Sequence, residues 1–173
     1  MSEQATADHI TLRDAAADFL AQERIAVAGV SRDASQPANL IYRRLRDAGH
    51  TVFAVNPHAD EVEGDRCFHT VAELPAGIDG MVIATPADQS AAVVEACAAA
   101  AIPRVWLHRG LGPGSLTDEA VAAAERSGLS VIPGGCPNMF GETSDAGHRG
   151  MLRVLQATGK VSRCADAYCC LVD

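Results

Sequence analysis

The chain has 173 residues, of which 48% are hydrophobic and 21% are charged, and its formal net charge at pH 7 is −8. This length and composition fit one globular domain and exclude two full-sized ones. The acidic balance argues against a nucleic acid or an anionic membrane bound through a general basic surface. We therefore expect no nucleic-acid or membrane partner, and any phosphate must be held by a local site.

Aromatic residues make up only 4% of the chain, so its core must consist of small aliphatic side chains, which suits layered α/β packing. No apolar run reaches the roughly 18 residues that cross a bilayer, and the polar start lacks the pattern of a signal peptide. We expect a cytoplasmic protein whose six cysteines are thiols. Cys67 and His69 lack the paired spacing of a zinc site, so we expect no metal.

The first half of the chain alternates between helical and strand patterns. Residues 10–22 have apolar side chains at helical spacing, and Thr11 is placed to cap that helix. The apolar run 25–30 is typical of a strand that is buried on both faces of a parallel sheet. A helix is expected at 38–48, ending at Gly49, and a strand at 51–55, ending at Asn56-Pro57.

The same alternation continues after a polar loop at 58–65 and a weak segment at 67–74. Strands are expected at 80–85, 104–108 and 129–133, and helices at 88–101 and 116–127. Five parallel strands with right-handed crossovers give an α/β fold, a doubly wound open sheet of the Rossmann-like type with helices on both faces.

We divide the chain into an N-terminal helix (1–22), a Rossmann-like domain (23–137) and a C-terminal appendage (138–173) with one helix near its middle. Residues 138–150 read as a loop. Apolar residues at 151, 152, 154 and 155 form a helix face that covers either the protein's own sheet or a second subunit or protein partner.

Ligands of open parallel sheets lie beyond the carboxyl ends of the strands, where the strand order reverses. The candidate site therefore consists of the residues that follow each strand. These are Gly29, Val30 and Ser31; Asn56 and Pro57; Thr85 and Pro86; His108 and Arg109; and Cys136 and Pro137.

The turn at Gly29 carries the strongest physical argument. A strand that ends in glycine and opens into a helix directs backbone N–H groups at an anion, and Ser31 adds a hydroxyl. The sequence lacks the full Gly-x-Gly-x-x-Gly fingerprint, so a tight turn that needs a small residue remains the alternative. Asn56-Pro57 replaces the acidic residue that holds a ribose in NAD-binding proteins, which counts against NAD.

Several turns in order carry a resemblance to a known family. The segment IAVAGVSRDASQPANLIYRRLRDAGHTVFAVNP, then VIATPAD, the arginine turn after VWLH, and VIPGGCPNMF resemble the CoA-binding domain family related to the N-terminal domain of the succinyl-CoA synthetase α subunit. The similarity extends over about residues 20–140.

The resemblance implies that the ADP part of CoA lies across the strand ends, with its phosphates near Ser31 and the helix that starts near Ala38. It further implies that Val55, Pro57, Thr85 and Pro86 line the adenine. The chain departs from the family pattern at Gln36 and His58, where relatives often have arginine and lysine. Both departures remove a cation that would meet phosphate, and Arg32 is placed to compensate for one of them.

The sequence predicts a CoA or acyl-CoA binding module and no catalytic residues. Its histidines form no recognisable nucleophile–base pattern with serine or cysteine. The alternative functions are an NAD(P)-dependent oxidoreductase with a degenerate fingerprint and a redox-responsive nucleotide-binding protein. For Cys136, either the thiol exchanges with CoA disulfide or the side chain is a small buried apolar group.

Overall fold

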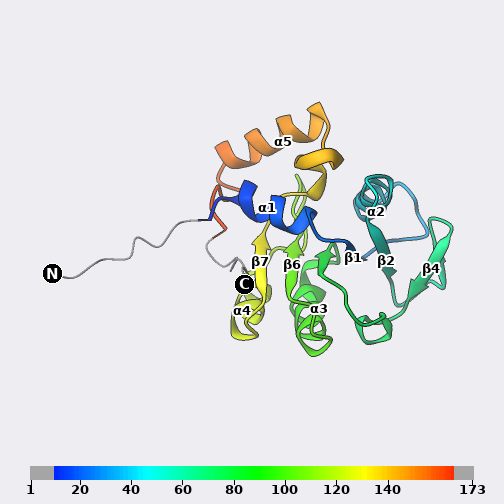
Figure 1. Ribbon diagram of the computed structural model, residues 1–173. Coiled ribbons are helices and arrows are strands. Elements are labelled where there is room, and N and C mark those ends of the chain that lie inside the picture. The colour runs from blue at the N-terminus through cyan, green and yellow to red at the C-terminus, as the bar shows by residue number, and fades with distance from the viewer. Residues whose placement is uncertain (1–9, 166–173) are drawn as a thin grey trace.

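A computed structural model of the chain describes residues 10–165. Its centre is one sheet of seven strands in the order β3-β4-β2-β1-β5-β6-β7 (Figure 1). Six strands pair in parallel and β3 pairs antiparallel with β4. The strands are β1 Arg24–Ala28, β2 Thr51–Val55, β3 Glu61–Val62, β4 Asp65–Phe68, β5 Gly80–Ile83, β6 Arg104–Leu107 and β7 Ser130–Pro133.

The expected doubly wound α/β fold is confirmed, and the strand order reverses between β1 and β5. The expected count of five strands is too low. The segment interpreted as a loop and a weak stretch forms the β3-β4 hairpin, and β4 joins the sheet edge, with Ala54 opposite Cys67 and Val55 opposite Phe68. These strands are only two and four residues long and are largely polar, so they lack an apolar run.

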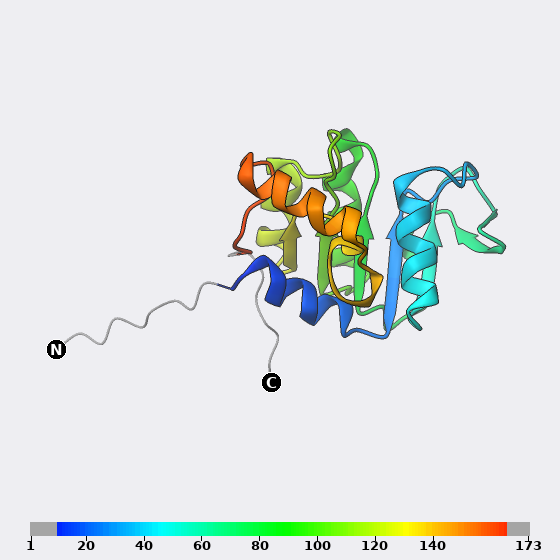
Figure 2. The same cartoon turned by 90° about the horizontal axis from the view of Figure 1, so that it is seen from above.

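Helices cover both faces of the sheet, as expected (Figures 1 and 2). On one face lie α1, α2 and α5; on the other lie α3 and α4. Thr11 caps α1 as expected, because its side chain accepts a hydrogen bond from the Asp14 amide. The helices are α1 Leu12–Leu20, α2 Pro37–Asp47, α3 Ala87–Ala99, α4 Asp118–Arg126 and α5 Ala146–Ala157, with short 3-10 turns at Val71–Glu73, Pro137–Met139 and Gly141–Thr143.

Successive residues of the central strands contribute to opposite faces of the core. In β1, Ile25 and Val27 pack beneath α1, α2 and α5, whereas Ala26 and Ala28 pack beneath α3 and α4. Trp106 of β6 is fully buried on the first face, and its indole N–H donates to the carbonyl of Gly134 at 2.9 Å. Burial on both faces explains why the strand sequences show no polar alternation.

The segment after β7 packs closely onto the first face. Helix α5 starts at Ala146, five residues before the apolar run that predicted it, because Asp145 caps it by accepting a hydrogen bond from the His148 amide. Leu152 and Leu155 are buried against the protein's own core, whereas Val154 is 55% exposed. Cys169 and Cys170 lie outside the described residues.

No helix in the described part of the chain is long and apolar enough to cross a membrane. Among residues 10–165, no group of three or more His, Cys, Asp or Glu side chains is placed to hold a metal ion.

Candidate functional site

The ends of β1 and β5 approach each other closely at the point where the strand order reverses. Gly29 follows β1 with φ +96°, and a Cβ on it would lie 2.5 Å from the carbonyl oxygen of Ala84. A side chain here would collide with backbone, and the positive φ would strain any other residue. Gly29 is therefore required by the protein's own packing, and its approach to a phosphate stays a prediction.

The loop between β1 and α2 is held by its own polar groups. The Ser31 amide donates to Asn39 Oδ1 at 2.9 Å, and Asn39 Nδ2 donates back to the Ser31 carbonyl at 2.7 Å. Asp33 accepts hydrogen bonds from Ser35 and Gln36, which lower the pKa of its exposed carboxyl group to about 2. The loop thus has a defined shape that places Gln36 at the start of α2.

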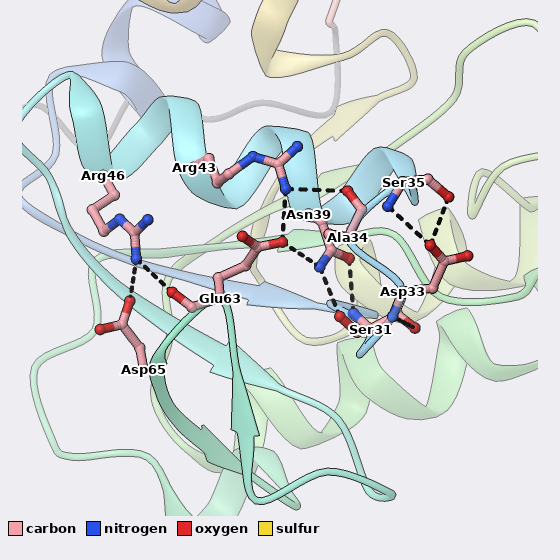
Figure 3. Close-up of polar contacts among 9 residues, drawn as sticks. All are labelled: Ser31, Asp33, Ala34, Ser35, Asn39, Arg43, Arg46, Glu63 and Asp65. Atoms are coloured by element: carbon pink, nitrogen blue, oxygen red, sulfur yellow. Dashed lines mark hydrogen bonds and ion pairs between the residues drawn. The ribbon is translucent and has the colours of Figure 1, made fainter.

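Glu63 in the β3-β4 hairpin fixes the orientation of Asn39 (Figure 3). Its Oε1 accepts from Asn39 Nδ2 and from Arg43 Nη1, both at 2.7 Å, and its side chain is 10% exposed. Arg46 binds the same hairpin through the Glu63 carbonyl and the Asp65 carboxylate. The sequence interpretation missed Asn39 and Glu63 because they are 24 residues apart and belong to no motif.

A cleft of about 790 Å³ opens at the carboxyl ends of β1, β2 and β5. The hydroxyl Oγ1 of Thr85 is buried in its wall and has no hydrogen-bond partner among the described residues. The described lining includes no arginine or lysine. The predicted site residues that line this first cleft are Gly29, Ser31, Gln36, Val55, Asn56, Pro57, Thr85 and Pro86, joined by His58, His69 and Val71 among others.

The Asn56 side chain is occupied by the loops at the bottom of the first cleft. Its Nδ2 donates to the Val30 carbonyl at 2.7 Å, and its Oδ1 accepts from the His58 amide at 2.8 Å. Asn56 therefore ties the end of β2 to the end of β1. No carboxylate follows β2 at the position where NAD-binding proteins hold the ribose.

A second cleft, of about 530 Å³, lies one strand further along the same edge, between the loop after β6, the turn after β7 and helix α5. His108, Cys136, Asn138 and His148 line it. Asn138 is 1% exposed, and its Oδ1 has no partner among the described residues. Burial, and to a smaller extent nearby His148, lower the pKa of His108 to about 4, so its ring is neutral at pH 7.

Two of the histidines are paired with carboxylates. His148 Nδ1 lies 2.8 Å from Asp145 Oδ2, and Asp145 also pairs with Arg44. Hydrogen bonds from His148 and Arg44 hold the pKa of the Asp145 carboxyl well below its usual range. His69 Nε2 lies 2.9 Å from Asp60 Oδ1 at the mouth of the first cleft.

Cys136 is 5% exposed, and burial raises the pKa of its thiol to about 12. The thiol is therefore protonated at neutral pH, and thiolate is the form that attacks disulfides. The environment favours the packing role of Cys136, and exchange with CoA disulfide stays a prediction. Cys67 and Cys97 are also buried free thiols, and Cys164 is a partly exposed one.

The remaining predicted site residues lie outside both cleft linings. The side chain of Val30 is fully buried in the core, and Pro137 is buried in the 3-10 turn after β7. Arg32 is exposed on the loop. The Arg109 amide donates to the Gly135 carbonyl at 2.9 Å, and its buried Nε has no partner among the described residues.

The Rossmann-like fold and the cleft at the carboxyl edge of its sheet agree with the protein family that the sequence matches. The sequence model of the CoA binding domain family matches residues 23–142. The chain belongs to that family, and the suspected relation to succinyl-CoA synthetase-like domains is confirmed.

Relatives of known sequence include much larger proteins. The chain is 30% identical over 144 residues, 80% of its length, to "Acetate--CoA ligase [ADP-forming] I" of Archaeoglobus fulgidus, and it spans only 21% of that ligase. It is 27% identical over 110 residues to YneT of Bacillus subtilis, which covers 64% of this chain and 78% of YneT.

Among solved structures, a protein of Pyrococcus horikoshii OT3 matches with a TM-score of 0.69 and 25% identity over 88% of this chain and 99% of that one. A dinucleotide-forming acetyl-coenzyme A synthetase of Ca. Korarchaeum cryptofilum, solved with phosphate and ADP, matches with a TM-score of 0.56 and 32% identity. That match covers 64% of this chain and 25% of the synthetase. These matches agree with the fold and the family and point to no oxidoreductase.

Proposed function

We propose that this chain binds coenzyme A or an acyl-CoA at the carboxyl edge of its sheet and acts as a non-enzymatic binding module, a sensor, carrier or regulator. The observation that carries the proposal is the first cleft, which lies at the reversal of strand order in a member of the CoA binding domain family. Such reversal points are where open α/β sheets hold nucleotides.

The first cleft fits the nucleotide part of CoA. Its apolar walls include Val55, Pro57 and Pro86, which suit the flat faces of an adenine. Thr85 Oγ1, buried without a partner among the described residues, supplies a hydrogen bond for the ligand, since such groups are otherwise costly to bury. The Ser31 hydroxyl and the start of α2 face the phosphates.

The hydrogen bonding of the Asn56 side chain favours CoA over NAD(P). Both polar atoms of its side chain bond the protein's own backbone, at Val30 and His58. An NAD ribose would meet no carboxylate after β2, and the dehydrogenase alternative lacks its usual anchor there. We therefore regard the oxidoreductase and redox-responsive functions as the weaker candidates.

Thermal unfolding of the purified protein tests the proposal. A ligand that binds only the folded state stabilises it by RT ln(1 + [L]/Kd), about 2.7 kcal/mol at a hundredfold excess over Kd. For a chain of this size we expect CoA to raise Tm by roughly 5–10 °C and NAD, NADP and adenosine to raise it less. A larger shift with NAD(H) than with CoA would show that the dehydrogenase alternative is right.

A further inference from the structure

A groove of about 610 Å³ lies between α1 and α5, which run side by side in roughly opposite directions (Figure 2). We call it the α1/α5 groove. One stripe of each helix lines it, with residues three or four positions apart, and residues 139–144 complete the lining. The stripe on α1 consists of Arg13, Ala17, Leu20 and Ala21, and the stripe on α5 consists of Arg149, Leu152, Arg153 and Gln156.

The α1/α5 groove is separate from the proposed CoA site. Ala21 and His50 line it shortly before β1 and β2 begin, so it reaches towards the amino ends of the strands, whereas the first cleft opens at their carboxyl ends. Both α1 and α5 lie outside residues 23–142, which match the family model. The groove is therefore built largely from segments that the family match does not include.

The groove gathers positive charge in a molecule whose formal net charge is −8. Arg13, Arg149 and Arg153 are exposed around it. Arg13 and Arg153 have no hydrogen-bond or ion-pair partner among residues 10–165, and Arg149 donates only to the neutral Ser144 hydroxyl at 3.1 Å. Glu142 supplies the one carboxylate in the described lining. The three guanidinium groups are thus available to an incoming anion.

The floor of the α1/α5 groove is apolar. Phe140 and Leu152 are each 8% exposed, and the partly buried Leu20 lies beside them in the lining. The groove volume falls within the range of small-molecule sites, which are mostly apolar with a few polar groups. By contrast, the described linings of the first and second clefts contain no arginine or lysine. Planar guanidinium forks match the oxygens of phosphate and carboxylate groups.

From these observations we infer that the α1/α5 groove binds a small organic anion that carries two negative charges on an apolar body, either a phosphomonoester or a dicarboxylate. The three arginines pair with the charged groups, and the apolar body packs on the floor. Two charges on the ligand balance the excess of the arginines over Glu142. The inference goes beyond the proposed function, because it assigns a second ligand site that CoA does not occupy.

Calorimetric titration of the purified protein tests the inference with phenyl phosphate and phenylsuccinate as dianionic probes. Benzyl alcohol, which lacks the charge, should bind at least about tenfold more weakly than the better dianion. Inorganic phosphate, which lacks the apolar body, should also bind more weakly. Binding of one dianion alone would support the inference and identify the charged group. Binding of neither in the millimolar range would overturn it.

Arginine variants locate the charged end of the probe. Arg13→Gln and Arg153→Gln should each weaken the better dianion by about fivefold, the value of one partly solvated charge pair. Arg126→Gln removes an exposed arginine of α4, on the opposite face of the sheet, and should leave the affinity unchanged. Equal weakening by all three variants would show a general attraction to the protein and would overturn the inference.

A variant without a charge change locates the apolar body. Ala17 is exposed on α1 and lines the groove, so Ala17→Trp fills the groove while the helix keeps its packing. We expect it to weaken the probe by at least about tenfold. Val154→Trp, on α5 but outside the lining, should have no effect. Unchanged affinity in Ala17→Trp would place the anion on the rim alone and overturn the inference.

Competition with CoA separates this site from the proposed one. The dianion should bind with the same affinity when the protein is saturated with CoA, because the two ligands occupy different edges of the molecule. Displacement of the probe by CoA would place the anion in the first cleft and overturn the inference. If CoA itself fails to bind, the proposed function falls, whereas a probe that responds to Arg13→Gln and Ala17→Trp still supports the groove site.

Discussion

At the scale of single residues, Thr85 carries an energetic cost at the wall of the first cleft. Its buried Oγ1 has no hydrogen-bond partner among the described residues, although its carbonyl accepts from Ser115. Burying an unsatisfied hydroxyl costs roughly 1–3 kcal/mol. The fold bears this cost at the wall of the first cleft, where a ligand would recover it.

Thr85→Val should therefore change stability and binding in opposite directions. Replacing the hydroxyl by a methyl group should raise the free energy of unfolding by about 1 kcal/mol and weaken CoA by a similar amount. Urea unfolding and calorimetry measure the two effects. Thr143→Val is the control, because the Thr143 hydroxyl donates within bonding distance of the Pro137 and Phe140 carbonyls, and its loss should lower stability and leave CoA binding unchanged.

Gly29 and Gly49 form a natural pair for measuring the close approach of β1 and β5. Their φ angles are +96° and +97°, but a Cβ on Gly49 meets nothing within 4 Å. Gly49→Ala should cost the backbone strain alone, about 1 kcal/mol. Gly29→Ala should cost at least 2 kcal/mol more in urea unfolding, because the backbone at Ala84 must move. Equal costs would show that the strand ends separate easily.

At the scale of elements, the β3-β4 hairpin supports the loop between β1 and α2 through Glu63 and Asn39. If Glu63 is lost, Asn39 keeps its bonds to Ser31 but no longer has a carboxylate to select its orientation. A flipped amide would direct Nδ2 at the Ser31 amide, which is itself a donor. Glu63 does not itself line the first cleft, so the hairpin acts on the cleft through Asn39 and the loop between β1 and α2.

Glu63→Ala should weaken CoA binding about fivefold while leaving the sheet intact, because the loop that faces the phosphates loses a fixed shape. Calorimetry gives the affinity, and amide hydrogen exchange at Ser31 should become faster. Glu61→Ala, an exposed change in the same hairpin, is the matched control. Unchanged affinity with faster exchange would show that the loop geometry does not limit binding.

The elements also show how far sequence reasoning reaches. Strands such as β1 and β6 were predictable because burial on both faces leaves an uninterrupted apolar run, and the Gly29 turn followed from where β1 ends. The β3-β4 hairpin was not predictable, since Asp65 and Arg66 give no apolar signal. The start of α5 was hidden because its first turn, Ala146 to Gly150, is polar and glycine-rich and only its Asp145 cap marks it.

For the candidate site, topology placed the predicted residues at one edge of the sheet but did not divide them between two clefts. That division depends on tertiary contacts, such as Ser115 to Thr85 and α5 over the turn at Cys136, which leave no local pattern. Val30 was expected at the site because it follows a strand. Its side chain instead faces the core, because the turn at Gly29 directs it inward.

At the scale of the whole molecule, a buried histidine in the second cleft, His108, lowers the stability of the fold in acid. The pKa of His108 falls from 6.5 to about 4 because burial disfavours its charged form. Between these pH values the unfolded chain binds more protons than the folded one, so stability rises with pH. The contribution of His108 is fully present above pH 6.5 and is lost as the pH falls towards 4.

Comparing unfolding at pH 7 and pH 5 isolates this effect, because the low pKa of Asp33, about 2, confines its own contribution to pH values below 4. Through His108, we expect the free energy of unfolding of the wild-type chain to fall by about 2 kcal/mol or less between pH 7 and pH 5. The smaller values apply because the ring is partly solvated. His108→Gln should abolish this part of the loss, and the exposed change His58→Gln should retain it. Equal losses in the wild type and His108→Gln would show that His108 is not the buried neutral group and that the second cleft is wetter than its lining indicates.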